Sequence, residues 1–311
     1  MPPTIIIGSG ITGLTCAHIL ARAGQAMRVL DKGRDIGGRM ATKRADAAGL
    51  ALSYDHGAQY LRPRDTDFGA FLARHGAVSW SDADPLHLVG QPGMSALPRA
   101  IAKGLDVAQG VEVLGLRHAQ GLWHLETNLG PLQAQRVVLT IPAPQALRLL
   151  GPDHPLAPEL ERVRMAPCLT LMASFPTGSP TPFTTWRDAD HPLAWIAQDN
   201  SKPGRPDDVI TWIAQASPDY SAAHLEDTPD TILSKMLPLL CTVLGTPPEQ
   251  ALHAQVHRWR YAQAVQPLGR PFLHAPQLYI GGDWCLGPRA EDGWRSGRAM
   301  AHAILGGADA V

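Results

Sequence analysis

Three glycines near the amino terminus have the spacing of a phosphate-binding turn. Gly8, Gly10 and Gly13 follow the β-forming residues 4–7 in the pattern Gly-x-Gly-x-x-Gly. The first glycine permits a sharp turn, the second lets backbone approach a pyrophosphate, and the third lets the next helix pack closely on the strand. Phosphates would bind at the free N–H groups and the positive dipole end of that helix. The pattern therefore predicts a dinucleotide-binding turn.

The elements around this turn have the order of a Rossmann-type unit. A helix over Leu14–Ala23 is expected to end at Gly24, and a second strand over Met27–Leu30 ends at Asp31. An acidic residue at this place binds a ribose hydroxyl in dinucleotide folds. Strand, helix, glycine and acid in one register favour this fold over a chance match.

Two later segments could add contacts to the same ligand. In 37–39, Gly-Gly-Arg, Gly38 would bring backbone close to it and Arg39 could pair with a pyrophosphate. The alternative is a surface turn with an exposed arginine. In 57–60, Gly-Ala-Gln-Tyr, two small residues would admit a flat ring, and the next two could hydrogen-bond or stack on it.

The carboxyl-terminal segment predicts a return to the ligand. A short strand, 278–280, runs into Gly281-Gly282-Asp283, and a final helix is expected over Arg295–Leu305. Asp292 is a candidate N-cap for that helix. A helix amino terminus aimed at a ring would stabilise negative charge on it.

The middle of the chain predicts a second, mixed β-sheet. In this middle part, about 152–258, strands are expected at 168–175, 193–198 and 209–215, and a helix at 228–244 that Pro238 kinks or splits. A separate β-rich section comes before it, with strands expected at 111–114, 122–127 and 136–141 and helices at 96–103 and 145–150. The overall prediction is an α/β protein.

Composition excludes several classes of function. The chain has 27 basic and 28 acidic residues, which gives no support for a nucleic-acid partner or a charged membrane surface. No apolar run approaches the length of a membrane span. The four scattered cysteines are typical of reduced thiols in a cytoplasmic protein. His253 and His257 lack the pattern of a metal site, and no Gly-x-Ser-x-Gly elbow favours a hydrolase.

The order of these motifs resembles the flavin-containing amine oxidase superfamily, whose members bind FAD in the glutathione-reductase manner. The resemblance covers essentially the whole chain. Within the superfamily, four runs are similar to renalases, especially bacterial ones; they are 199–205, 216–221, 257–261 and 281–284. The segments 37–39 and 281–283 lie outside a simple nucleotide domain and also favour FAD over NAD as the resident cofactor.

The resemblance implies a specific oxidoreductase. Renalases oxidise misreduced dihydropyridine dinucleotides, NAD(P) forms that carry their hydride at ring position 2 or 6. FAD accepts the hydride at N5 and O2 reoxidises it, giving hydrogen peroxide. No catalytic side chain is expected, because the cofactor carries the difficult step. The expected FAD-binding residues are Gly8, Gly10, Thr12, Gly13, Asp31, Lys32, Gly38, Arg39, Gly57, Ala58, Gln59, Tyr60, Val113, Gly282, Asp283, Gly293 and Trp294.

Two departures separate the chain from amine oxidases. Those enzymes carry a lysine that reaches toward flavin N5 through a water, and here Pro167 or Cys168 aligns with it. A cysteine for a covalent flavin link is also missing, and Cys285 at a different offset is a packing residue rather than a tether. The FAD is therefore expected to be non-covalent.

Substrate contacts are expected from the middle of the chain. Candidates for the walls of a ring-sized slot, or for polar contacts there, are Trp186, Trp195, Asn200, Trp212, Arg258 and Tyr261. Each aromatic candidate alone could instead be a core residue. Arg187, Lys202, Arg205, Arg258 and Arg260 could receive phosphates, although each alone could be a solvated surface charge.

We expect a discontinuous FAD-binding domain, residues 1–60, 98–150 and 262–311, and a substrate domain, residues 61–97 and 151–261. Two alternatives stay open. One is an amine oxidase or desaturase of the same superfamily, which would need an aromatic cage or acidic slot for a cation. The other is a flavoprotein with a structural or redox-sensing FAD. The preferred isomer, the choice of NAD or NADP, the physiological electron acceptor and the oligomeric state are left open.

Overall fold

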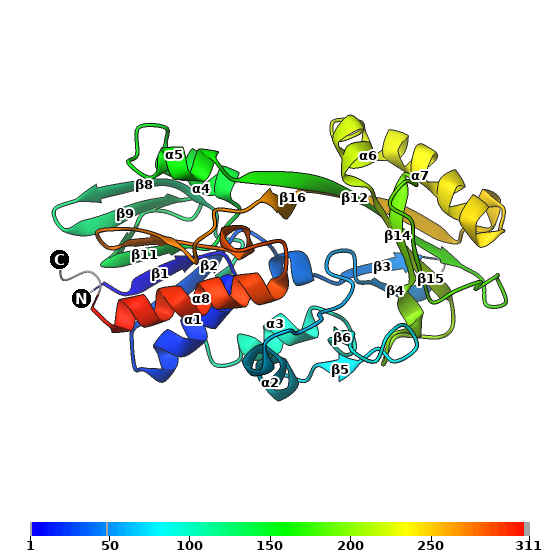
Figure 1. Cartoon of the computed structure of the whole chain (residues 1–311), viewed down its shortest axis with the longest axis horizontal. Coiled ribbons are helices and arrows are strands. Elements are labelled where there is room, and N and C mark those ends of the chain that lie inside the picture. Colours follow the sequence, from blue (N-terminus) through cyan, green and yellow to red (C-terminus); the bar gives the residue numbers. More distant parts are fainter. Residues whose placement is uncertain (1, 48, 308–311) are drawn as a thin grey trace. The chain divides into compact units, whose positions relative to one another are not determined.

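The computed structural model describes residues 2–47 and 49–307 (Figure 1). It divides into two compact units. The first contains residues 2–38, 98–165 and 263–307, and the second contains 39–47, 49–97 and 166–262. The helices are α1 (Ile11–Arg22), α2 (Thr66–Arg74), α3 (Ala96–Ile101), α4 (Ala143–Leu150), α5 (Ala157–Glu161), α6 (Pro218–Ala223), α7 (Pro229–Leu244) and α8 (Ala290–Leu305).

In the described residues the strands form a six-stranded, mostly parallel sheet, a five-stranded antiparallel sheet and three smaller sheets. They are β1 (Thr4–Ile7), β2 (Met27–Asp31), β3 (Lys43–Ala47), β4 (Leu50–Tyr54), β5 (Val78–Ser79), β6 (Leu88–Val89), β7 (Val107–Gln109), β8 (Val113–Ala119), β9 (Leu122–Thr127), β10 (Leu132–Ala134), β11 (Arg136–Leu139), β12 (Arg164–Phe175), β13 (Thr185–Arg187), β14 (Leu193–Gln198), β15 (Ile210–Ala216), β16 (His253–Gln266), β17 (Leu273–Ala275) and β18 (Leu278–Ile280).

The first unit is built on a six-stranded sheet of order β17-β18-β11-β1-β2-β7. Every neighbouring pair in it is parallel except β17 and β18. The central strand β1 is buried along its whole length, which explains its continuous run of apolar, β-branched residues. This confirms the predicted Rossmann-like sheet.

Alternate side chains of β1 serve two different cores. Ile6 packs with Cys16 and Leu20 of α1 and with Met300 of α8 on one face. Ile5 and Ile7 pack on the other face with the β-sheet of order β10-β9-β8, through side chains that include Trp123 and Leu125. The first unit is therefore layered as helices, parallel sheet and antiparallel sheet.

Helices α1 and α8 lie side by side because two glycines of α8 leave room for α1 (Figure 1). A Cβ at Gly293 would approach the Thr12 hydroxyl to 2.8 Å, and one at Gly297 would clash with the Thr12 carbonyl oxygen. Gly297 thus has the tight-packing role that its small size suggests.

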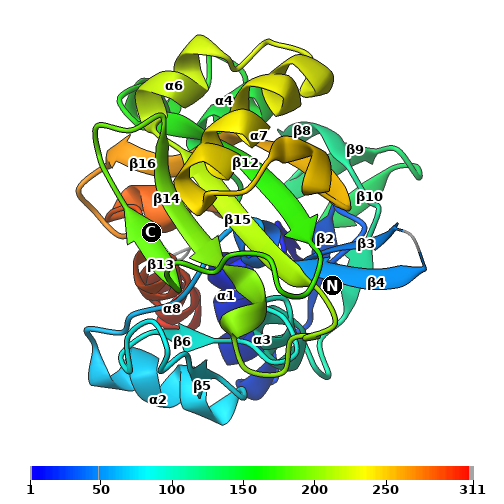
Figure 2. The same cartoon turned by 90° about the vertical axis from the view of Figure 1, so that its right-hand side faces the viewer.

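The second unit is built on an antiparallel sheet of order β13-β14-β15-β12-β16. Helix α7 lies across one face of this sheet (Figure 2), where Ile232, Met236 and Leu240 pack against strand residues such as Leu171 and Trp212. The hairpin of β3 and β4 also belongs to this unit, because Leu52 and Tyr54 share a core cluster with Met172 and Ile213.

Several element boundaries differ from the sequence expectation. Residues 39–60 pack with the second unit, whereas the predicted division lay at residue 60. Helix α7 is one helix with Pro238 inside it, not two helices. Asp292 is not the N-cap of α8, because the helix begins at Ala290 and Asp292 accepts a hydrogen bond from the Arg289 N–H from within its first turn. The strand expected at 111–114 begins only at Val113.

Candidate functional site

Gly8 and Asp31, two of the predicted dinucleotide-binding residues, lie at one edge of the sheet of the first unit, together with Thr140 and Gly281. Gly8 follows β1, Asp31 ends β2, Thr140 follows β11 and Gly281 follows β18. These strands are parallel, so their carboxyl ends meet at the same edge. Ligands of open α/β sheets bind at this edge.

The three glycines of the turn have three different environments. Gly8 has φ +112°, a conformation that favours glycine. A Cβ at Gly13 would clash with the Gly8 carbonyl oxygen and lie 2.6 Å from the Thr140 hydroxyl. A Cβ at Gly10 would meet no protein atom of the described chain within 4 Å. Gly8 and Gly13 are thus needed by the fold, whereas Gly10 borders open space that a ligand can use.

Asp31 is already held by the turn that it faces. One carboxylate oxygen accepts hydrogen bonds of 2.6 Å from both the N–H and the hydroxyl of Ser9, and the other accepts one of 2.7 Å from the Gly33 N–H. These bonds orient the carboxylate at the end of β2. Lys32 points elsewhere, because its ammonium lies 3.7 Å from Glu112 and is largely exposed.

These residues fit the pyrophosphate and ribose of a dinucleotide. No side chain caps the amino terminus of α1, so the first N–H groups of this helix are left for a ligand. Gly38 has φ +54°, and a Cβ on it would lie 3.7 Å from the Gly10 Cα. The Gly37 N–H donates a hydrogen bond to the Ser9 carbonyl oxygen. The Gly-Gly turn therefore lies against the glycine-rich turn.

The remaining predicted cofactor residues of the first unit lie around α8. Gly282 and the buried Asp283 precede a short 3-10 helix, η4 (Asp283–Cys285), and Gly293 packs on Thr12. Trp294 is buried beneath the guanidinium of Arg298, 4.6 Å away. Val113 begins β8 and is half-buried. Their contacts with a cofactor remain predictions.

Cys285 has the properties of a packing residue. Its side chain is fully buried, and burial raises the pKa of the thiol to about 12. A neutral thiol is a poor nucleophile, since the thiolate is the reactive form.

In the second unit, Arg39 and the segment 57–60 contact one another directly. The Ala58 N–H donates to the Arg39 carbonyl at 2.8 Å, and a Cβ at Gly57 would clash with that same oxygen. The Arg39 guanidinium donates to the Ala262 carbonyl at 2.8 Å. The lack of a side chain at Gly57 thus makes room for the backbone of Arg39, and the contact of this segment with a flat ring stays a prediction.

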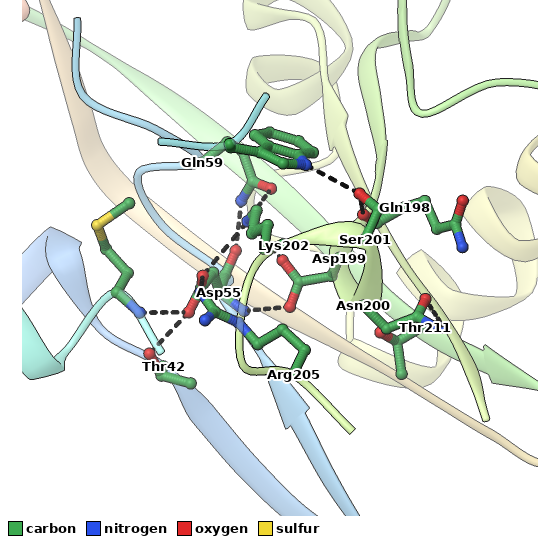
Figure 3. Close-up of polar contacts among 12 residues, drawn as sticks. Thr42, Asp55, Gln59, Gln198, Asp199, Asn200, Ser201, Lys202, Arg205 and Thr211 are labelled. Carbon is green, nitrogen blue, oxygen red and sulfur yellow. Dashed lines mark hydrogen bonds and ion pairs between the residues drawn. The ribbon is translucent and has the colours of Figure 1, made fainter. Parts of the chain in front are cut away.

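A buried cluster of four charged residues supports this segment (Figure 3). Lys202 donates to Asp199 at 2.5 Å and to Asp55 at 3.3 Å, and Arg205 donates to Asp55 at 2.5 Å. All four side chains are essentially inaccessible to solvent. Two cations and two carboxylates balance, as buried charges must.

The cluster reaches the predicted cofactor segment through Gln59. Lys202 donates to the Gln59 side-chain oxygen at 3.3 Å, and the Gln59 amide nitrogen donates to the carbonyl oxygens of Asp55 and Gly57. The Gln59 side chain is therefore occupied within the second unit. Lys202 also lies 5.1 Å from the centre of the Trp80 ring, a cation–π contact.

The two carboxylates of the cluster have opposite pKa shifts. Burial alone would raise the pKa of Asp55, but Lys202, Arg205 and the Met94 N–H lower it below its usual value. Burial raises the pKa of Asp199, which Lys202 only partly offsets while the charge of Asp55 raises it further. Asp55 is thus the firmly ionised member of the pair.

His56 adjoins the same segment and is buried among aromatic rings. Its ring lies 4.7 Å from His257 and 5.1 Å from Trp259, between ring centres. Burial, followed by His257 and Lys43, lowers the pKa of His56 to about 4. The folded protein therefore holds His56 neutral at pH values where an unfolded chain would protonate it.

This shift predicts a specific acid sensitivity. Below about pH 6.5 the unfolded chain binds a proton at His56 that the folded protein does not bind. The free energy of unfolding should therefore fall between about pH 6.5 and pH 4, by up to about 3 kcal/mol. His56→Phe keeps a ring and should flatten this slope in urea unfolding between pH 7.5 and 4.5. Replacing the exposed His302 with Phe is the matched control and should keep the slope. Equal slopes for wild type and His56→Phe would contradict the assignment.

The candidate substrate residues do not all lie in accessible positions. Trp212 is fully buried in the core beneath α7, so it is not a wall of an open slot. Trp186 packs at the edge of that core, and the Asn200 side-chain oxygen accepts a hydrogen bond of 3.0 Å from the Thr211 N–H. Trp195 lies beside Tyr60, with ring centres 5.6 Å apart.

Two further candidates lie on β16. Arg258 donates to the Asp227 carbonyl, and Tyr261 is half-buried. Lys202 and Arg205 were read from the sequence as solvated charges, which is wrong because both are buried in the charge cluster. Asp55 and Asp199 were not predicted as a pair. The run of opposite charges in 199–205 was the available signal, but no sequence periodicity reveals that such charges are buried.

Two models of known protein families match this chain. A family model described as "NAD(P)-binding Rossmann-like domain" matches residues 6–74, and one described as "Flavin containing amine oxidoreductase" matches residues 81–305. The second match covers most of the chain. The chain belongs to the flavin-containing amine oxidoreductase family. It is accordingly an oxidoreductase with a flavin cofactor, and the dinucleotide-binding turn described above fits that cofactor.

Individual relatives agree with this family. Renalase of Mus musculus is 27% identical over 320 residues, covering 91% of this chain and 93% of the mouse protein. The structure of putrescine oxidase bound to putrescine superposes with a TM-score of 0.72 at 15% identity, covering 98% of this chain and 99% of that one. Cyclohexylamine oxidase from Brevibacterium oxydans gives a TM-score of 0.69 at 15% identity with the same coverage. The similarity to these two solved structures, at 15% identity, shows only that the fold is shared.

The described residues show neither a membrane-spanning helix nor a cluster of metal ligands. Among residues 2–47 and 49–307, no helix is long and apolar enough to cross a membrane. Within the same ranges, no group of three or more histidine, cysteine or acidic side chains could hold a metal ion.

Proposed function

We propose that this protein is an FAD-dependent oxidase of renalase type. Its substrates would be dihydro-NAD(P) isomers that carry their hydride at position 2 or 6 of the nicotinamide ring, and its products NAD(P) and hydrogen peroxide. In balance, one dihydro isomer, one proton and one O2 give one oxidised dinucleotide and one hydrogen peroxide.

The observation that carries this proposal is the whole-length similarity to mouse renalase. The solved amine oxidases share the fold at far lower identity. The resemblance of the runs 199–205 and 257–261 to renalases supports the same reading.

The strand that would carry the amine oxidase lysine supports it as well. In β12 the aligned positions are Pro167 and Cys168, neither of which supplies a cation. Burial raises the pKa of the Cys168 thiol to about 11, so this side chain stays neutral. Lys202, the buried lysine of the second unit, is engaged by Asp55, Asp199 and Gln59. None of these groups is free to serve an amine as a base.

Bound FAD would supply the hydride acceptor and the route for electrons to O2. The chain's own residues would bind and orient the reactants. Gly10 and the amino terminus of α1 would hold the pyrophosphate, and Asp31 the adenosine ribose. The amino terminus of α8 would favour negative charge near Gly293. Arg39, Ala58 and Tyr60 would position the flavin ring. We propose that FAD is held non-covalently, consistent with the buried Cys285.

Product analysis in air tests this function. We expect each active dihydro-NAD isomer, prepared by borohydride reduction of NAD, to consume one O2 and yield one NAD and one hydrogen peroxide. An oxygen electrode, a peroxidase-coupled peroxide assay and chromatography of the nucleotides measure the three quantities. Peroxide formation from a primary amine, without turnover of any isomer, would assign the chain to amine oxidation instead.

A further inference from the structure

The second unit contains five cations that the sequence offers equally as phosphate receivers, and the structure separates them. Lys202 and Arg205 are neutralised by buried carboxylates. Arg260 forms a two-pronged ion pair with Glu226, with distances of 2.6 and 3.0 Å. Arg258 donates to a backbone carbonyl. Among the described residues neither Arg258 nor Arg187 pairs with a carboxylate, but Arg258 is partly buried whereas Arg187 is exposed.

Arg187 is nevertheless held in place. It lies opposite Trp195 in the register of β13 and β14, and its guanidinium lies 5.1 Å from the centre of the Trp195 ring. One of its terminal nitrogens donates to the Tyr60 hydroxyl at 3.3 Å. The other N–H groups of the Arg187 guanidinium have no hydrogen-bond partner in the described part of the chain. An exposed arginine oriented by two aromatic side chains has less freedom to lose on binding.

The surroundings of Arg187 contain polar atoms that also lack partners. His87 stacks on Tyr60 with ring centres 3.6 Å apart and is only 8% exposed. Its Nδ1 atom and the Trp195 indole N–H are both buried without a hydrogen-bond partner among the described residues. Buried polar atoms are normally satisfied, so such atoms mark places where a ligand or water belongs.

Charges of both signs act on His87. Burial lowers the pKa of His87, and the charges of Arg62 and Arg187 lower it further, while Asp84 opposes them. Two guanidinium groups thus act on the same ring. Asp84 lies on the Nε2 side of His87, 3.8 Å away, whereas Nδ1 has no hydrogen-bond partner among the described residues.

We propose that Arg187, oriented by Tyr60 and Trp195, receives a phosphate of the dinucleotide substrate. This subsite rests on the proposed function, because it binds the phosphates that a dihydro-NAD(P) has and a simple dihydropyridine lacks. Arginine suits this task, since its planar fork matches phosphate oxygens.

The first test is a comparison of substrates with and without phosphate. Arg187→Met should raise KM for a dihydro-NAD isomer by about 10- to 100-fold, because losing a charge-assisted hydrogen bond weakens affinity by about that factor. It should leave kcat unchanged, and also KM for the matching dihydronicotinamide riboside, which has no phosphate. Arg187→Lys should recover part of the loss. Arg260→Met is the matched control and should behave as wild type.

The second test does not depend on turnover. Isothermal titration of the flavin-saturated protein with ADP should show binding that weakens at least about tenfold in Arg187→Met and in 0.5 M salt, which screens exposed charges. If no isomer is oxidised but ADP binding depends on Arg187, the proposed function fails and the phosphate subsite stands. The proposal is overturned if wild type does not bind ADP, if Arg187→Met binds it as wild type does, or if the variant impairs the riboside equally.

Discussion

Replacing Lys202 with methionine should lower the free energy of unfolding by about 3–5 kcal/mol. The change removes the cation that Asp199 and Asp55 share while both carboxylates stay buried. A methionine fills much of the same volume, so the loss should arise from unpaired charge rather than from a cavity. Urea unfolding at pH 8 measures the effect.

The pH dependence of Lys202→Met separates charge from packing. Burial already raises the pKa of Asp199, and without Lys202 that pKa should rise further. A carboxyl group whose folded pKa is raised adds stability at low pH and loses it as pH rises through that pKa. The loss should therefore be smaller at pH 5 than at pH 8, and Asp199→Asn in the same variant should recover part of it.

A matched control is Lys235→Met, which breaks an exposed ion pair with Asp227. It should cost no more than about 1 kcal/mol. An equally small loss for Lys202→Met would contradict the account of a buried, mutually dependent cluster. A loss of similar size at pH 5 and pH 8 would assign the effect to packing.

Replacing Gly13 with alanine should weaken both folding and flavin binding. The new Cβ would clash with the backbone oxygen of Gly8, which cannot move without changing the turn itself. Overpacking of this kind costs about 1–3 kcal/mol, and a distorted turn should weaken flavin binding about 10- to 100-fold. Flavin fluorescence titration and urea unfolding of the apoprotein measure the two effects.

Gly10→Ala is the informative comparison. Gly10 has φ −75° and ψ 178°, which any residue can adopt, and its Cβ would meet no described protein atom within 4 Å. Apoprotein stability should therefore match wild type, whereas flavin binding should weaken because the methyl group occupies the space assigned to the pyrophosphate. Unchanged flavin binding in Gly10→Ala would contradict that assignment.

The sequence was most informative where one residue type has one physical use. The glycine-rich turn was placed correctly after β1 and Asp31 at the end of β2. Few residues other than glycine allow the positive φ of Gly8 or the close packing of Gly13 on the Gly8 backbone. Strands β9 and β14 were predicted with the bounds that the structure shows, since their apolar residues face a core on one side.

The sequence was less informative where burial contradicts residue type. Strand β16 was not predicted, because its arginines, histidines and glutamines lack the alternation of a half-buried strand. The charge cluster around Lys202 was missed for the same reason, since charged residues are seldom buried unless they are paired. The N-cap of α8 was predicted at Asp292, about one turn too late, because a carboxylate suits both the N-cap and the first turn of a helix.

The central claim is hydride transfer from a misreduced dinucleotide to the flavin, and anaerobic stopped-flow spectroscopy tests it most directly. The purified protein would be mixed separately with 2- and 6-dihydro-NAD, ordinary NADH and a panel of primary amines, while the absorbance of oxidised flavin is followed at about 450 nm. We predict fast bleaching by at least one of the two isomers, slow or no bleaching by NADH and amines, and peroxide once air is admitted. Bleaching by amines alone would contradict the account.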